Sequence, residues 1–160
     1  MTIDLGSAII GVIIVIIATL PFVMMSRSKT KKEKKLHQKL VDLALQKSSK
    51  INNYQALQHL AIGLDTDNHY VFFCDTQDEV SIENAVDLSK IKQVNLIKDK
   101  ENKKDSQKIK RVGLKFIPQN KDYKTEFFEF FNDDKNPQVF GEIQMAEKWV
   151  NILQKHINKA

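Results

Sequence analysis

The chain opens with an uninterrupted apolar run before any amphipathic pattern begins. From Leu5 to Met25, twenty-one consecutive residues carry no charge, and most are Ile, Val, Leu, Phe or Met. A helix of this length, at about 1.5 Å per residue, spans roughly 31 Å, which matches the hydrocarbon thickness of about 30 Å in a bilayer. A helix also satisfies its own backbone in lipid. The run therefore predicts an N-terminal tail and one transmembrane helix within residues 1–25.

The next segment, residues 26–53, combines helical periodicity with many lysines. Between Lys29 and Lys50, apolar residues recur at spacings of three and four, which predicts a helix with one apolar stripe. The stripe comprises Leu36, Leu40 and Leu43 with the flanking Val41 and Ala44. It is shorter than two heptads and cannot specify a coiled coil alone. Residues 48–53, SSKINN, predict a linker. We therefore expect a basic juxtamembrane helix and a linker.

From residue 54 onward the apolar period changes to two, which is typical of strands. The predicted strands are Leu60–Leu64, Tyr70–Cys74, Val80–Ile82, Ala85–Asp87, Ile91–Ile97, Val112–Phe116 and Thr125–Phe131. The first two flank the turn Asp65–Asn68 and predict a β-hairpin. The lysine-rich stretch Lys98–Lys108 is polar, and we expect a loop there.

The last segment, Gly141–Asn158, predicts an amphipathic helix of about four turns. Its apolar stripe comprises Ala146, Trp149, Val150, Leu153 and Ile157. Short strands in series followed by one helix predict an α+β, mainly β fold over residues 54–160. The expected form is a curved antiparallel sheet or partly open barrel, capped by the C-terminal amphipathic helix.

The net charge of +5 is unevenly distributed along the chain. Residues 26–50 carry a net +7, whereas residues 51–160 carry a net −1. A nucleic-acid partner is not expected, because it would need positive surface on the domain itself. The positive-inside rule places the basic flank in the cytoplasm. We expect a single-pass protein of a bacterial inner (cytoplasmic) membrane, with the N-terminus outside and the C-terminal domain in the cytoplasm.

Six basic residues at the start of this flank form a candidate contact with an anionic lipid surface. They are Arg27, Lys29, Lys31, Lys32, Lys34 and Lys35. Each cation near an anionic membrane surface contributes about 1 kcal/mol to adhesion. The alternative is that this cluster serves only as the topology signal.

Four stretches of the domain resemble a known family. They are LAIGLDTDNHYVFF (Leu60–Phe73), VDLSKIKQVNL (Val86–Leu96), EFFEFFND (Glu126–Asp133) and EIQMAEKWVNIL (Glu142–Leu153). They resemble the small pleckstrin-homology-like (PH-like) proteins of unassigned function found in bacteria, several of which have one N-terminal membrane helix. The resemblance covers about residues 54–158 and brings no catalytic residue. It implies core positions for Ile62, Val94, Phe116 and Trp149.

The resemblance also implies a way of binding. PH domains commonly bind phosphoinositides through Lys and Arg in the first hairpin loop. We assign Asp65–His69 to that loop, where Asp65 and Asp67 would repel a phosphate. Headgroup binding is therefore not expected. The other common use of the fold is to present a sheet edge, or a groove beside the helix, to a protein segment.

No catalytic, cofactor or metal motif stands out. The loop from Asp65 begins like a calcium loop, but Tyr70 and Thr76 occupy the positions that need Gly and Glu. The four histidines have no i, i+4 pairing and no neighbouring cysteine, so a zinc site is not expected. The single cysteine, Cys74, belongs to an apolar run, and we expect it to be buried in a strand.

These patterns favour a noncatalytic, membrane-anchored binding or scaffolding module that presents a PH-like domain at the cytoplasmic face. Its expected partners are the lipid bilayer and a protein, and no cofactor is expected. One alternative is a structural accessory subunit of a membrane complex, in which the transmembrane helix makes the key contacts. A second alternative is an enzyme with an unrecognised site.

Overall fold

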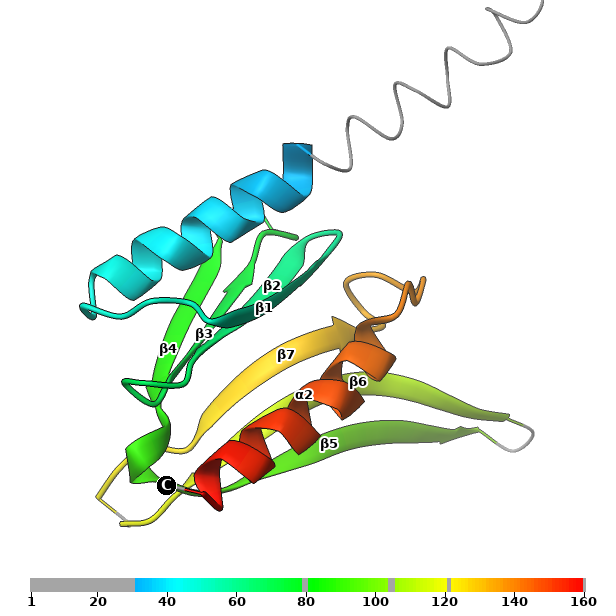
Figure 1. The fold of residues 1–160 in the computed structure, drawn as a ribbon. Coiled ribbons are helices and arrows are strands. Elements are labelled where there is room, and N and C mark those ends of the chain that lie inside the picture. The colour runs from blue at the N-terminus through cyan, green and yellow to red at the C-terminus, as the bar shows by residue number, and fades with distance from the viewer. Residues whose placement is uncertain (1–30, 79–80, 104–105, 121, 160) are drawn as a thin grey trace, which may run out of the picture.

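The computed structural model describes residues 31–78, 81–103, 106–120 and 122–159. In this part the chain forms two antiparallel sheets and two helices (Figure 1). The helix over residues 31–45, called the N-terminal helix below, covers one face of the first sheet. The second helix, α2 (Glu142–Ile157), lies along the second sheet.

The first sheet is a four-stranded meander in the order β1-β2-β3-β4. Its strands are β1 (Asn53–Leu57), β2 (Leu60–Asp65), β3 (Tyr70–Asp75) and β4 (Ile82–Asp87). A short 3-10 helix, η1 (Leu88–Lys90), follows β4, and the Asp87 side chain caps it by accepting the Ser89 N–H. The chain then enters the second sheet.

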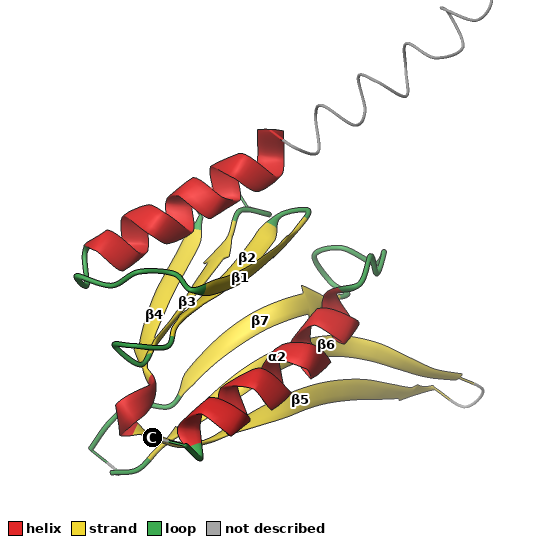
Figure 2. Cartoon of the chain, viewed as in Figure 1, coloured by secondary structure: helices red, strands yellow, loops and turns green. Residues whose placement is uncertain are grey.

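The second sheet has three strands in the order β5-β6-β7, shown with the first sheet in Figure 2. Its strands are β5 (Ile91–Lys103), β6 (Ser106–Pro118) and β7 (Glu126–Asn132). Helix α2 contacts all three strands. Its Gln154 side chain accepts the Val94 N–H of β5 at 3.1 Å, which fixes the helix along that strand.

The main core lies between the two sheets and α2. Period-two alternation directs Ile62, Val94 and Phe116 inward, and Trp149 reaches the same core from α2. All four residues are buried, as the resemblance implied. The ring of Phe73 from the first sheet stacks on that of Phe128 from the second, with centroids 4.9 Å apart. The core therefore joins the two sheets.

A second apolar cluster lies on the opposite face of the first sheet. Leu36 and Leu40 of the N-terminal helix are buried there against Ala61, Phe72 and Cys74 of β2 and β3. This contact explains why all six residues of β2 are buried. The predicted apolar stripe is thus confirmed, and the sheet is the surface that it covers. The domain boundary at residue 54 stays a prediction.

The expected fold class is corrected in two respects. The described strands form two sheets rather than one curved sheet or partly open barrel. Within the described ranges, no helix is long and apolar enough to cross a membrane. Helix α2 has 16 residues with only one apolar face, whereas a spanning helix needs about 20 apolar residues. The expected transmembrane helix, Leu5–Met25, lies outside the described residues. The predicted fold class, one transmembrane helix followed by one curved sheet or barrel, is therefore wrong for the described residues.

Local elements also differ from the expectations. The stretch Lys98–Lys108, expected as a loop, contributes to the paired ends of β5 and β6, where Glu101 pairs with Lys108. The exposed polar residues of this stretch, including Lys98 and Lys108, show no apolar alternation that would indicate a strand. The SSKINN linker ends at β1, a strand that we did not predict. The two short strands expected around residues 80–87 are one described strand, β4.

Candidate functional site

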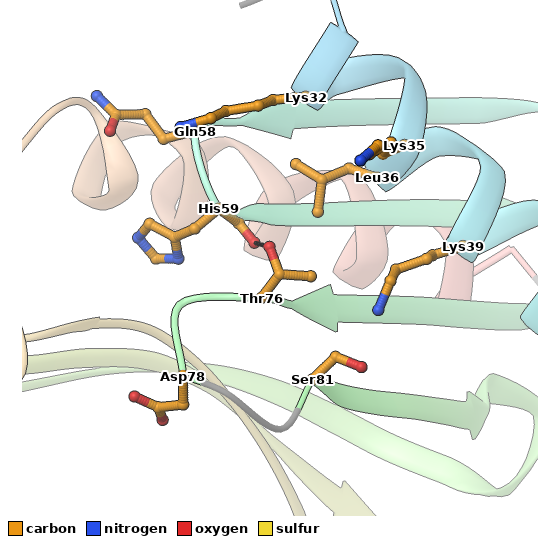
Figure 3. Close-up of a pocket in the computed structure, with 9 residues that line it drawn as sticks. All are labelled: Lys32, Lys35, Leu36, Lys39, Gln58, His59, Thr76, Asp78 and Ser81. Atoms are coloured by element: carbon orange, nitrogen blue, oxygen red, sulfur yellow. Dashed lines mark hydrogen bonds between the residues drawn. The ribbon is translucent and has the colours of Figure 1, made fainter.

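A pocket of about 390 Å³ lies between the N-terminal helix and two turns of the first sheet (Figure 3). We call it the lysine pocket. It is lined by Lys32, Lys35, Leu36, Lys39, Gln58, His59, Thr76, Asp78 and Ser81. Three cations and several hydroxyl or amide groups therefore surround one apolar side chain.

Helical spacing places the three lysines at this pocket. Leu36 is buried against the sheet, and Lys32 lies one helical turn before it. Lys35 and Lys39 are one turn apart and flank the same apolar stripe. In Figure 3 the Lys32 side chain extends from the helix toward Gln58. The lysines thus border the seam between the helix and the sheet.

The opposite wall is a tight turn held by Thr76. Gln58 and His59 connect β1 to β2, and Gln58 has the left-handed backbone angle φ of 53°. The His59 carbonyl oxygen accepts the Thr76 N–H at 2.8 Å and the Thr76 hydroxyl at 2.9 Å. These two bonds fix the end of β3 against the turn, so this wall is preformed.

Two described carboxylates, one that lines the pocket and one that meets a lining lysine, are already paired. Lys39 Nζ lies 3.3 Å from Glu83 Oε1, and Asp78 Oδ2 accepts from Lys135 Nζ at 2.9 Å. Lys32 and Lys35 are exposed and form no ion pair with any residue that the structure describes. Among the described residues, these two cations of the pocket therefore have no ion-pair partner.

A buried polar cluster connects the turn to α2. His59 Nδ1 lies 2.8 Å from Asp75 Oδ1, and His59 Nε2 lies 3.9 Å from Glu142 Oε1. Both carboxylates are buried, and Glu142 is in the first turn of α2. Burying a carboxylate without a polar partner costs free energy. The His59 imidazole lies between these two carboxylates and provides a partner for each. The cluster holds the turn, β3 and α2 together.

This arrangement is suited to holding an anion. Lysine ammonium groups and hydroxyls donate to carboxylate or phosphate oxygens, and charge assistance strengthens such bonds. Within the described residues, no group of three His, Cys, Asp or Glu side chains could hold a metal ion. The chemistry that the pocket offers is therefore recognition of an anionic group.

Of the six basic residues in the predicted cluster, four lie in the N-terminal helix, and two of these four line the pocket. Arg27 and Lys29 lie outside the described residues. Lys31, Lys32, Lys34 and Lys35 are exposed on the N-terminal helix, but only Lys32 and Lys35 of these line the pocket. Sequence reasoning did not select Lys39, although its i, i+4 spacing from Lys35 was a usable signal. Contact of the cluster with anionic lipid stays a prediction.

The assignment of the first hairpin loop was wrong. Because β1 pairs with β2, the first hairpin turn is Gln58–His59, and the acidic loop belongs to the second hairpin. Headgroup binding was therefore excluded on the charge of the wrong loop. Asp65 is also fully buried rather than displayed at the loop surface, and it accepts the backbone N–H groups of Lys50, Asp67 and Asn68.

Burial by itself would raise the pKa of Asp65, but its hydrogen bonds outweigh that effect. The backbone and side-chain N–H groups of Asn68 contribute most, followed by the N–H groups of Lys50 and Asp67. Together they hold the pKa at about 2. Asp65 is therefore a structural carboxylate that organises the β2–β3 turn.

The single cysteine and two of the histidines do not line the pocket. Cys74 is fully buried, as predicted, and burial raises the pKa of its thiol to about 11. His69 and His156, which the sequence pattern did not relate to each other, meet with His69 Nδ1 and His156 Nε2 2.9 Å apart. Neither feature lies at the lysine pocket.

Comparisons of the chain with protein-family models, with curated proteins and with solved structures found no match. The function is therefore inferred from the geometry of the chain itself.

Proposed function

We propose that this protein is a noncatalytic binding module and that its lysine pocket holds an acidic segment of a partner protein. The observation that carries the proposal is that Lys32 and Lys35 are exposed at a preformed pocket and form no ion pair within the described part of the chain. The paired carboxylates of Glu83 and Asp78 do not neutralise these two lysines. A ligand with carboxylate groups would supply the missing countercharge.

The PH-like resemblance is part of this proposal. The described strands form one meander of four strands and one of three, and the C-terminal helix α2 lies along the three-stranded sheet. This layout supports a PH-like arrangement. A fold of this kind presents grooves to protein segments without any catalytic residue. The N-terminal helix adds to this arrangement a wall that carries three lysines.

The test is the affinity of the full-length protein for a labelled synthetic peptide of alternating Glu and Ser, measured by fluorescence anisotropy. The variant Lys32→Gln/Lys35→Gln removes two of the three lysines that line the pocket. Its matched control, Lys31→Gln/Lys34→Gln, removes the same charge from exposed positions of the same helix that do not line the pocket.

We expect the pocket variant to weaken binding about tenfold or more and to reduce its dependence on salt, because close charge pairs are lost. The control variant should retain most of the wild-type affinity. Equal losses in the two variants would indicate attraction by overall charge and would refute a site at the pocket.

A further inference from the structure

Two adjacent apolar residues are exposed near the lysine pocket. Val139 and Phe140, in the loop between β7 and α2, are 46% and 45% exposed. Single exposed apolar residues are common on protein surfaces and need no explanation. This exposed pair is different, because its loop is linked to a turn that forms one wall of the lysine pocket.

The loop that carries this pair is held in place by hydrogen bonding. The Phe140 N–H donates to Glu142 Oε2 at 2.6 Å, and Glu142 is buried. The other oxygen of that carboxylate faces His59 Nε2 at 3.9 Å. Phe140 is thus connected through one buried side chain to the turn that forms a wall of the pocket.

Gly141 brings the loop close to the same turn. It has a φ of 119°, which L side chains rarely adopt, and an added Cβ would lie 3.5 Å from Leu57 Cδ2. Leu57 directly precedes the Gln58–His59 turn. In Figure 3, Gln58 and His59 extend from this turn away from Leu36. The turn is therefore a common border between the lysine pocket and the loop.

We propose that the pocket and the apolar pair form one surface, which binds an acidic protein segment that also carries a large apolar side chain. The carboxylates occupy the lysine pocket, and the apolar side chain packs on Val139 and Phe140. This inference rests on the proposed function. It adds an apolar contact, which would let the protein distinguish one acidic segment from another. Lysines alone attract any acidic segment and discriminate poorly, whereas an apolar contact requires a particular side chain at a particular spacing.

The shape of the pocket favours a protein segment over a lipid surface. It has a volume of about 390 Å³, and Thr76 and Ser81 are among the residues that line it. Side chains of a peptide can enter such a concavity, whereas the plane of a bilayer meets mainly the outer lysines. Anionic vesicles are therefore the competing ligand in the test.

The experiment compares two labelled peptides on the full-length protein. The first is the alternating Glu and Ser peptide, and the second is the same peptide with one Phe added after a two-residue spacer. Phe140→Ser removes the larger apolar side chain of the exposed pair. Leu45→Ser is the matched control, because Leu45 is 65% exposed on the N-terminal helix and does not line the pocket.

We expect wild-type protein and Leu45→Ser to bind the Phe-containing peptide about tenfold more tightly than the plain one, as burial of part of a Phe ring provides. Phe140→Ser should bind both peptides with the wild-type affinity for the plain one. If the plain peptide binds but Phe adds nothing, or if Phe140→Ser keeps the gain, the inference is overturned while the proposed function stands. If neither peptide binds, or vesicles of phosphatidylserine bind more tightly than both, the inference and the proposed function both fail.

Discussion

The ring of Phe127 lies directly against the backbone of Gly113 on the neighbouring strand. A Cβ added at Gly113 would be 2.2 Å from Phe127 Cζ and 2.5 Å from the Phe128 carbonyl oxygen. The Arg111 guanidinium lies over the same Phe127 ring, 4.5 Å from the ring centre. The ring therefore occupies the space that a side chain would take, and β6 accommodates it only because residue 113 is glycine.

Gly113→Ala should consequently destabilise the protein by about 2 to 3 kcal/mol, in the upper part of the range for overpacking. Rotation of Phe127 cannot relieve the whole clash, because the carbonyl oxygen is part of the backbone. Gly63→Ala is the control, since its Cβ would meet only the Ile51 side chain at 3.0 Å. Urea unfolding of both variants measures the difference. Equal costs at the two positions would show that the Phe127 contact is not formed in solution.

The N-terminal helix should contribute to the stability of the domain through its buried leucines. Leu40 is fully buried against the first sheet, so Leu40→Ala should lower the free energy of unfolding by about 2 to 5 kcal/mol. Leu45→Ala, at a position that is 65% exposed, should change it by less than about 0.5 kcal/mol. A negligible effect of Leu40→Ala in chemical denaturation would mean that the helix is not packed on the sheet, and the lysine pocket would lose one wall.

Asp65 should give the protein an acid-dependent stability. Its folded-state pKa of about 2 is below the ordinary value of 3.8, so the contribution is complete above about pH 4 and is lost as the pH falls toward 2. A shift of this size corresponds to about 2.5 kcal/mol. In Asp65→Asn the free energy of unfolding should vary less between pH 5 and pH 2, and the protein should be less stable at pH 7.

The control for this measurement is Asp67→Asn, an exposed carboxylate in the same turn. It should leave the pH profile of unfolding nearly unchanged. A profile of Asp65→Asn that coincides with that of the control would contradict the structural role of Asp65.

The contact between His69 and His156 should make the end of α2 sensitive to mild acid. Desolvation lowers the pKa of His156, and neighbouring His69 lowers it further, with a smaller effect from Lys159 and an opposing one from Asp65. The unfolded chain therefore binds a proton near pH 6.5 more readily than the folded chain. Stability is complete above this pH and falls as the pH decreases below it.

NMR titration of the His156 ring measures this directly. His69→Asn removes the second imidazole while keeping a residue type that tolerates the left-handed φ of 57°. It should raise the pKa of His156 toward its ordinary value, whereas His37→Gln should not change it. An unchanged His156 titration in His69→Asn would show that the rings do not interact.

Much of the core could be predicted from the sequence because its signal is local. Alternation in β6 and the stripe around Trp149 directly reflect which faces are buried. The N-terminal helix was also predicted from its spacing, but its contact with the sheet was not. The residues that it covers, such as Phe72 and Cys74, are in a strand that is apolar on both faces, and this pattern does not indicate what covers the second face.

The candidate site was less predictable because it is assembled from distant segments. Lys32 and Thr76 are far apart in the sequence and meet only after the helix packs on the sheet. The paired ends of β5 and β6 are polar and have no apolar alternation, so their sequence predicts a loop rather than strands. The unpredicted strand β1 moved the first hairpin turn from the acidic loop to Gln58–His59. That single shift changed which residues were candidates for binding.

The most direct test of the lysine pocket as a binding site is an amide NMR titration of the full-length protein with the alternating Glu and Ser peptide. Four residues that line the pocket should report the same binding event: Lys35, Gln58, Thr76 and Ser81. We predict that their amide signals shift with increasing peptide and that all four titration curves give the same dissociation constant. In Lys32→Gln/Lys35→Gln these shifts should require about tenfold more peptide or higher to saturate, in line with the weaker binding expected of that variant. Saturating shifts confined to the open edge of β5 beside α2, with the pocket residues unmoved, would contradict binding at the lysine pocket.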